Sequence, residues 1–479
     1  MNNGVNMNVF YRDIDSDYVK SSPLHILFFA EFFPSYTCGV TRRLKEIVQR
    51  LVRQGHYIYV ITGCKDADAW LEDSDLPRDR ITFFILASTN FKNKINSALP
   101  FLYPHPAIFS AICQFSPDVV HIVDLTPAST LCGTFAKALN KPIIWSLHTN
   151  IDAYLSNYIR LFAVKYAQRV YQFIRVRYLH YSTVNLTVSQ DFADFITHRG
   201  VPQPIVVWKT GVDSTLFHPA KRSRSMRYRM FGTTTNYTEE EMDRITVFVS
   251  VGRISPEKNF EFLSLLLERI SCQSFLCIIG DGPYRYTLEP YFSSDRVYFF
   301  GYLDGEELAN AYASADYFIY ASVSETFGQV YLEAMASGTP VVAAKGSQLN
   351  ELFVSGECGY MWEPGNLDSA EQAIGLAMKD RDNLSIKARQ QALKYSWDSA
   401  TDQINNIYRQ AIVEHPAVHL DTTLPFSLAF FSRLFYYCIS WFFYTLLAIL
   451  FIAPFVRVSS PMSITNRTNN KTTHNRTET

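Results

Sequence analysis

The sequence lacks the cysteine pattern of a disulfide-stabilised or zinc-binding protein. Its eight cysteines are scattered over 479 residues. The one close pair, Cys272 and Cys277, has no histidine or further cysteine at metal-ligand spacing. A basic surplus is also missing, because 44 Lys and Arg stand against 45 Asp and Glu. Since nucleic-acid binders usually carry such a surplus, we expect reduced thiols and no nucleic-acid partner.

An apolar targeting segment is missing from residues 1–22, which carry three aspartates and are expected to be disordered. A long apolar segment is present instead near the C-terminal end of the sequence. Residues 434–456 contain no charged side chain and lie between Arg433 and Arg457. As a helix they would extend about 34 Å, against a hydrocarbon thickness of about 30 Å. We therefore expect one transmembrane helix there, with the large N-terminal part in the cytosol and a polar tail at 457–479; a buried amphipathic helix is the alternative.

Apolar runs alternate with helical patterns through the body of the chain. The run Leu24–Ala30 precedes a helical pattern at Val40–Gln54, and a second such series begins at Ile245–Val251. Continuous apolar strands flanked by helices are typical of a parallel sheet covered on both faces. We therefore expect an α/β protein with two doubly wound, Rossmann-like domains facing each other across a cleft, at 23–208 and 209–412.

The segment Lys221–Asp243 is polar and charged without a strong period, so we expect a surface insertion just after the domain junction. Ligands of doubly wound sheets bind beyond the carboxyl ends of the strands. Polar residues that follow the apolar runs are therefore the candidates for a functional site.

The strongest group of candidates is the run Ser324–Gly338, which follows an apolar strand and opens a helix. Free amides at a helix N-terminus form an anion site suited to a diphosphate. Glu333, inside the helix, could accept two hydrogen bonds from a ribose diol, and Glu325 would face sugar hydroxyls. The alternative is a capping acid and an exposed helical residue. The amides in question belong to Thr326, Phe327 and Gly328.

Two further turns follow strands of the same domain. Arg253 and Lys258 place two cations where a departing diphosphate would collect negative charge, unless they belong to a solvated turn. Gly280, Asp281 and Gly282 follow the next strand, and glycines permit close approach of a ligand to the backbone. A plain turn is the alternative.

The first domain offers weaker candidates. Gly39 opens a helix and would let a phosphate or an acceptor approach the amides. His148 ends the apolar run Pro142–Leu147 and could hydrogen-bond a sugar, or it could be a core histidine. The helix after Gly39 carries a basic face that would meet anionic lipid or solvent. That face consists of Arg42, Arg43 and Lys45.

Together these motifs resemble the retaining glycosyltransferases of family 4, which have the GT-B fold of two facing Rossmann-like domains. The resemblance covers residues 24–410 and includes the spacing of Glu325 and Glu333 and the motif Lys209–Asp213. Within the family, the run Gly280–Arg285 is among those most similar to sulfoquinovosyl-diacylglycerol synthases. It is also similar to bacterial mannosyltransferases acting on diacylglycerol-type and phosphatidylinositol lipids.

The resemblance implies a hexosyltransferase whose co-substrate is a UDP- or GDP-linked sugar bound by the second domain. Glu333 would hold the ribose, Arg253 and Lys258 the diphosphate, and Glu325 and His148 the sugar. The acceptor would bind the first domain, and the expected membrane helix favours a diacylglycerol-type lipid. The resemblance also implies no metal or other cofactor, and no Asp-x-Asp adjoins a candidate sugar site. A soluble oligosaccharide acceptor and an inactive scaffold of the same fold are the alternatives.

Overall fold

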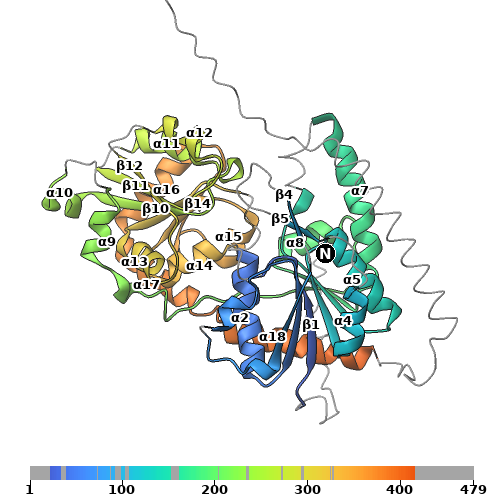
Figure 1. Ribbon diagram of the computed structural model, residues 1–479. Helices are drawn as coiled ribbons and strands as arrows, with labels where there is room; N and C mark the ends of the chain where they lie inside the picture. Colours follow the sequence, from blue (N-terminus) through green and yellow to red (C-terminus); the bar gives the residue numbers. More distant parts are fainter. Residues whose placement is uncertain are drawn as a thin grey trace, which may run out of the picture.

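The computed structural model forms two lobes, each built on one parallel sheet (Figure 1). The lobe coloured blue to green holds the N-terminal half of the chain, and the lobe coloured green to orange holds most of the rest. The structure describes residues 22–33, 39–72, 74–86, 88–91, 99–102, 107–152, 161–202, 204–232, 237–270, 273–292, 296–323, 325 and 328–415.

The first sheet has seven strands in the order β3-β2-β1-β6-β7-β8-β9, and every neighbouring pair is parallel. The strands are β1 (His25–Phe29), β2 (Tyr57–Thr62), β3 (Ile81–Ile85), β6 (Val119–Val123), β7 (Ile143–Leu147), β8 (Val184–Thr187) and β9 (Ile205–Val207). A separate hairpin pairs β4 (Ser88–Phe91) with β5 (Leu99–Leu102).

Helices cover both faces of the first sheet. In α2, Leu44, Ile47, Val48 and Leu51 recur at helical spacing and are fully buried, which is why this segment forms an amphipathic helix against the sheet. The helices of this lobe are α2 (Gly39–Arg53), α3 (Ala69–Glu72), α4 (Ala107–Phe115), α5 (Pro127–Ala138), α7 (Leu161–Leu179) and α8 (Gln190–Thr197).

The second sheet has six parallel strands in the order β12-β11-β10-β13-β14-β15. They are β10 (Thr246–Val251), β11 (Ser274–Ile279), β12 (Val297–Gly301), β13 (Tyr317–Tyr320), β14 (Val341–Ala344) and β15 (Gly359–Trp362). The helices around them are α9 (Arg224–Arg229), α10 (Glu239–Arg244), α11 (Phe260–Arg269), α12 (Arg285–Leu288), α13 (Gly305–Ser314), α14 (Gln329–Ala336), α15 (Ser347–Leu352), α16 (Leu367–Lys379) and α17 (Arg381–Ala392). The expected pair of doubly wound parallel sheets is confirmed.

The segment Lys221–Asp243 is not the surface insertion that its composition predicts. Met226, Met230 and Phe231 are buried in the core of the second lobe, and the Phe231 ring lies 4.6 Å from that of Phe275 on β11. The prediction failed because arginines surround these few apolar residues, and α9, only six residues long, is too short to give a clear period.

The last described helix, α18 (Trp397–Glu414), returns to the first lobe, where it lies beside α2 (Figure 1). Trp397, Ile404 and Tyr408 are buried in the core of the first sheet. The range 209–412 expected for the second domain thus includes a helix whose contacts are with the first. The chain crosses between the lobes twice, near Gly211 and near Trp397. These two connecting segments lie against each other, because a Cβ on Gly211 would lie 2.3 Å from the Trp397 backbone nitrogen.

The expected transmembrane helix at 434–456 and the tail at 457–479 lie outside the described residues, as do residues 1–21. Among the helices that the structure describes, none combines the length and the apolar character needed to cross a bilayer.

Candidate active site

Glu325 and Lys258 form an ion pair at the carboxyl edge of the second sheet. Lys258 ends a 3-10 turn after β10, and Glu325 follows the neighbouring strand β13, so the topology brings the two side chains together. Tyr320, the last residue of β13, donates a hydrogen bond of 2.9 Å to the same carboxylate. Burial alone would raise the pKa of Glu325, but the charge of Lys258 and these hydrogen bonds lower it. Glu325 is therefore an anion at neutral pH.

Glu333 lies in the second turn of α14 and is 1% exposed. Its Oε1 forms an ion pair of 2.5 Å with the guanidinium of Arg42, and Tyr312 donates a hydrogen bond of 3.3 Å to its Oε2. Arg42 belongs to α2 of the first lobe, so this carboxylate joins the two lobes directly. The charge of Glu333 raises the pKa of Arg42 further.

The expected basic face on α2 is therefore wrong for two of its three residues. Arg42 points to Glu333, as described above. Arg43 is 1% exposed, lies 3.7 Å over the Trp208 ring and donates hydrogen bonds to the carbonyl oxygens of Trp208 and Lys209. Arg43 contacts the linker after β9 and faces neither lipid nor solvent, whereas the side chain of Arg42 is 33% exposed and its guanidinium is paired with Glu333. Sequence periodicity alone could not reveal this, because both surfaces that bury them come from distant segments.

One aromatic cluster supports both carboxylates. The ring of Phe318 lies 5.6 Å from Tyr320 and 5.9 Å from Tyr312, and Tyr331 packs edge-on against Tyr320 at 5.7 Å. Such packing fixes ring positions. The hydroxyls that bind Glu325 and Glu333 are consequently held by a shared core. Sequence reasoning missed both tyrosines because apolar neighbours make them resemble ordinary core residues.

The expected diphosphate site at the start of α14 is only partly described. Gly328 precedes the helix with a φ of 69°, a left-handed conformation that favours glycine. Thr326 and Phe327 lie outside the described residues. The role of these three amides stays a prediction.

Arg253 follows β10 and is exposed, and among the described residues its guanidinium has no hydrogen-bond or ion-pair partner. It differs in this from Lys258, which is paired with Glu325. A cation without a protein partner at this edge is free to meet an anionic ligand.

The two glycines after β11 are required by the packing of one loop on another. Gly280 has a φ of 134°, and a Cβ there would lie 2.0 Å from the Gly252 carbonyl oxygen. A Cβ on Gly282 would lie 2.1 Å from the Ile254 oxygen. Asp281 is exposed and accepts a hydrogen bond of 2.8 Å from the Gly282 amide. The packing of this turn is sufficient to explain why these residue types occur here. Their contact with a donor therefore stays a prediction.

In the first lobe, Gly39 opens α2 at an exposed position, and a Cβ there would meet no atom within 4 Å. His148 is 3% exposed and shares a hydrogen bond of 3.0 Å with the Ser146 hydroxyl, which also contacts His121 at 2.8 Å. Burial lowers the pKa of His148 well below its ordinary value, and nearby Arg43 lowers it further. The histidine is therefore neutral and has a core partner, and its contact with a sugar stays a prediction.

Two carboxylates at the edge of the first sheet were not predicted from the sequence as site residues. Glu31 follows β1 and accepts a hydrogen bond of 2.6 Å from the Thr126 hydroxyl. Asp124 follows β6 and accepts the His148 amide at 2.7 Å. Desolvation raises the pKa of Glu31 to about 7 and that of Asp124 to about 6. The signal was available: both follow apolar strands at the carboxyl edge, the rule that identified the second domain's candidates.

Two family models match the chain. The model described as Glycosyltransferase Family 4 matches residues 37–216, and the model described as Glycosyl transferases group 1 matches residues 238–395. The first covers most of the lobe that holds Arg42, and the second covers the lobe with Lys258, Glu325 and Glu333.

Characterised relatives are similar over most of their length. Sulfoquinovosyl transferase SQD2 of Arabidopsis thaliana is 31% identical over 400 residues, which are 81% of this chain and 73% of that protein. A GDP-mannose-dependent alpha-mannosyltransferase of Mycolicibacterium smegmatis is 29% identical over 81% of this chain and 98% of its own. Alpha-monoglucosyldiacylglycerol synthase of Streptococcus pneumoniae is 25% identical over 81% and 86%.

The fold is also similar to that of a solved structure. HepE of Anabaena, solved with UDP and glucose, superposes with a TM-score of 0.61 at 19% identity, covering 80% of this chain and 99% of that one. This confirms the GT-B arrangement of two Rossmann-like lobes. With the family models and a relative 31% identical over most of both chains, it follows that the chain belongs to the family 4 glycosyltransferases, in the neighbourhood of the sulfoquinovosyl, mannosyl and glucosyldiacylglycerol enzymes.

Proposed function

We propose that the protein transfers a hexose from a UDP- or GDP-linked sugar to a lipid acceptor of the diacylglycerol type, with retention of the anomeric configuration. The observation that carries the proposal is a pair of carboxylates with cationic partners at one edge of the second sheet: the partly buried Glu325 with Lys258, and the buried Glu333 with Arg42. The name of the alpha-monoglucosyldiacylglycerol synthase relative supports a lipid acceptor of the diacylglycerol type.

The donor binds to the second lobe. Glu333 accepts hydrogen bonds from the ribose diol, and since Arg42 and Tyr312 already occupy its oxygens, the ribose must share them or displace Arg42. Arg253 and Lys258 then balance the negative charge of the diphosphate. Glu325, kept ionised by Lys258, accepts hydrogen bonds from hydroxyls of the hexose. The amides around Gly328 add positive partial charge to the same region.

During transfer the bond between the anomeric carbon and the diphosphate oxygen breaks, and both electrons go to the diphosphate. Arg253 and Lys258 stabilise that charge as it develops. The acceptor hydroxyl oxygen bonds to the anomeric carbon on the face that the diphosphate leaves, and its proton passes to a diphosphate oxygen. No covalent sugar–enzyme intermediate, metal ion or further cofactor is needed for this sequence.

The acceptor binds to the first lobe. Glu31 and Asp124 lie at the carboxyl edge of that sheet and can accept hydrogen bonds from acceptor hydroxyls once they are ionised. His148, neutral and adjacent to Asp124, completes this group. Closure of the lobes over both substrates excludes water and limits hydrolysis of the donor.

A helix at 434–456 would anchor the protein to the membrane, with the two lobes in the cytosol. Its length fits the hydrocarbon thickness, and an anchor would hold the lobes near a lipid acceptor. Extraction of membranes with alkaline carbonate tests the anchor: the full chain should remain in the pellet, and a variant without residues 434–479 should be released. Release of the full chain would contradict the anchor.

The reaction is tested by incubating the full-length protein with radiolabelled UDP- and GDP-hexoses, diacylglycerol vesicles and soluble oligosaccharides. Label in the organic extract, with one nucleoside diphosphate released per hexose, is the expected result. Label confined to the oligosaccharides would overturn the lipid acceptor, and no transfer from any donor would favour an inactive scaffold. The Lys258→Gln variant is assayed beside the wild type. Label that appears with the wild type and not with the variant is due to enzymatic transfer rather than to background.

A further inference from the structure

A cavity of about 620 Å³ lies on the second lobe away from the proposed donor site. It opens at the amino ends of β10 and β13, where Thr246 and Tyr317 begin those strands, whereas Lys258 and Glu325 lie past their carboxyl ends. The six residues of β10 separate the two edges by roughly 20 Å. The cavity is therefore distinct from the proposed active site.

The lining of this cavity is strongly cationic. Its charged residues are five arginines and two aspartates, a net charge of +3. An arginine side chain stays protonated in proteins, so this excess persists at every physiological pH. Glu239 and Asp382 do not line the cavity, but they pair with two of its arginines: Glu239 with Arg224 at 3.9 Å, and Asp382 with Arg381 at 3.5 Å. The lining arginines are Arg222, Arg224, Arg227, Arg244 and Arg381.

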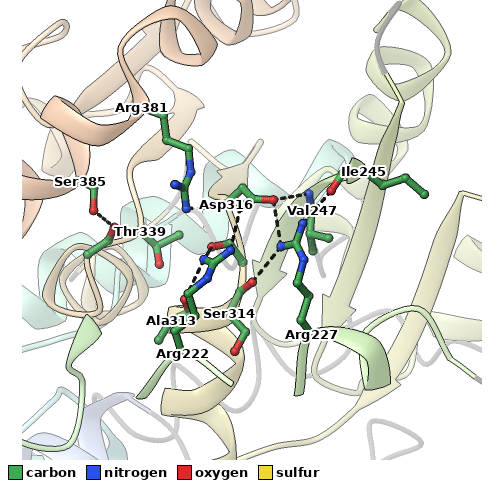
Figure 2. Close-up of polar contacts among 12 residues, drawn as sticks. Arg222, Arg227, Ile245, Val247, Ala313, Ser314, Asp316, Thr339, Arg381 and Ser385 are labelled. Carbon is green, nitrogen blue, oxygen red and sulfur yellow. Dashed lines mark hydrogen bonds and ion pairs between the residues drawn. The ribbon is translucent and has the colours of Figure 1, made fainter. Parts of the chain in front are cut away.

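Three of these arginines converge on one carboxylate, as Figure 2 shows. Asp316 forms ion pairs with Arg227 at 3.0 Å and with Arg222 and Arg381 at 3.3 Å. Arg227 has a structural role, because it is 9% exposed and also donates to the carbonyl oxygens of Ser314 and Ile245. Arg222 likewise donates to the carbonyl oxygens of Ala313 and Ala315. Among the described residues Arg381 contacts only carboxylates, so it is the arginine of the three that exceeds what the fold requires.

Three arginines of the lining keep unused hydrogen-bond donors. The Nε of Arg381 is buried and has no hydrogen-bond partner, which is costly unless a ligand supplies one. Arg244, at the end of α10, is exposed on the rim, and in the described part of the chain it has no hydrogen bond or ion pair. Arg222 is 45% exposed, and its two terminal nitrogens bond to Ala313, Ala315 and Asp316 without using every N–H that they carry. These three donors face one cationic cavity from three elements of the fold.

We propose that this cavity binds a phosphate group, held by Arg222, Arg244 and Arg381. Guanidinium groups donate paired hydrogen bonds that match phosphate oxygens. The volume accommodates a phosphate with a further substituent, and the net charge favours a dianion over a neutral ligand. The phosphate comes either from a soluble compound or from a phospholipid headgroup, and the chemistry of the site is the same for both.

Calorimetry of the full-length protein with inorganic phosphate tests the site. The Arg253→Gln/Lys258→Gln double variant removes the contribution of the proposed donor site, and phosphate should still bind to it. Adding Arg244→Gln and Arg381→Gln should weaken that binding at least about tenfold. Arg229→Gln in the same double-variant background is the matched control. Arg229 lies on α9, a helix whose Arg224 and Arg227 line the cavity, but it pairs with Glu307 and does not line the cavity itself, so binding should be unchanged.

No binding by the donor-site double variant, or equal binding after the Arg244→Gln and Arg381→Gln substitutions, would overturn the proposal. Should the combined variant fail to fold, Arg244→Gln alone keeps the test valid, because this side chain is exposed. Short-chain, water-soluble phosphatidic acid in the same titration identifies the source. Binding tighter than that of inorganic phosphate indicates a headgroup, and binding of inorganic phosphate alone indicates a soluble ligand; both support the site.

Discussion

The carboxylates at the functional edges of the two lobes differ in one respect, namely whether a cation accompanies them. In the second lobe, Glu325 has Lys258 and Glu333 has Arg42. In the first lobe, Glu31 and Asp124 have only neutral hydrogen-bond donors among the described residues. The pKa of Glu325 is consequently lowered, whereas the pKa of Glu31 is raised to about 7.

This difference matches the tasks that we propose for the two lobes. A donor that carries two negative charges needs a cation whose position is fixed, and Glu325 holds Lys258 in place for this purpose. A neutral acceptor hydroxyl needs only a hydrogen-bond acceptor. The second lobe should therefore work with little pH dependence near neutrality, and the first should respond to pH.

The largest effect is expected from Lys258→Gln. Loss of this cation leaves Glu325 buried without its partner and removes a positive charge from the departing diphosphate, so kcat should fall about 10²- to 10³-fold. The measurement is hexose transfer at saturating donor. Lys221→Gln is the matched control, because Lys221 pairs with Glu306 on the surface of the same lobe and does not follow the carboxyl end of a strand of its sheet. A Lys258→Gln enzyme with wild-type kcat would contradict the proposal that this cation stabilises the departing diphosphate.

Glu333→Gln should act on donor binding more than on chemistry. The amide keeps the shape but loses the charge that pairs with Arg42, so the donor KM should rise about tenfold or more while kcat changes less. Arg42→Gln sharpens the test, since it frees an oxygen of Glu333 for the ribose but loosens the contact between the lobes. Steady-state kinetics with varied donor separates these effects; an unchanged donor KM for Glu333→Gln would count against ribose binding there.

Glu31→Gln should change the pH dependence of the first lobe. The pKa of Glu31 is about 7 in the folded protein, against 4.5 for an ordinary glutamate side chain, so the ionised form is disfavoured by folding. The wild type therefore loses stability as pH rises from about 4.5 to about 7, and the variant does not. Unfolding measured at about pH 8 should show Glu31→Gln to be the more stable protein by about 1–2 kcal/mol.

The same substitution should also lower activity near pH 8 severalfold, because the ionised carboxylate is the proposed acceptor of the substrate hydroxyl. A wild-type pH–rate profile that rises through about pH 7, and flattens in Glu31→Gln, is the expected outcome. Profiles of the same shape for both proteins would remove Glu31 from the acceptor site. Thr126→Val is a suitable second variant, because it deletes the hydrogen bond to Glu31 and leaves the carboxylate in place.

The smallest effect is expected from removing metal ions. Arg253, Lys258 and the amides of α14 are proposed to balance the diphosphate without a cation cofactor. Transfer rates with excess EDTA should therefore stay within about twofold of the untreated rate, a change worth less than about 0.5 kcal/mol. Loss of activity that Mg²⁺ or Mn²⁺ restores would show that these side chains do not suffice.

Much of the fold followed from the sequence, because the central strands of both sheets, such as β1, β6, β10 and β13, are nearly continuous apolar runs. Lys258 and Glu325 could be chosen because each lies in the loop after such a strand, and Glu333 because it lies one to two turns inside the helix that follows one. Their partners could not be chosen in this way. Arg42 lies 291 positions from Glu333 in the sequence, and only the facing of the two lobes brings them together.

The residues that were misjudged share a second cause, which is burial by distant segments. Arg43 is covered by Trp208, and α18 crosses to the first lobe although it follows the second in the chain. Glu31 and Asp124 are different, since both follow apolar strands and a consistent use of the same rule would have found them. Sequence patterns thus indicate edges of sheets well and the contacts between lobes poorly.

The most direct test measures the KM values for donor and acceptor separately, in one set of assays, for Glu333→Gln and Glu31→Gln. Glu333→Gln should raise the donor KM about tenfold and leave the acceptor KM nearly unchanged, and Glu31→Gln at about pH 8 should raise the acceptor KM and leave the donor KM nearly unchanged. A Glu31→Gln enzyme with a weakened donor KM, or a Glu333→Gln enzyme impaired only toward the lipid, would contradict the assignment of donor and acceptor to the two lobes.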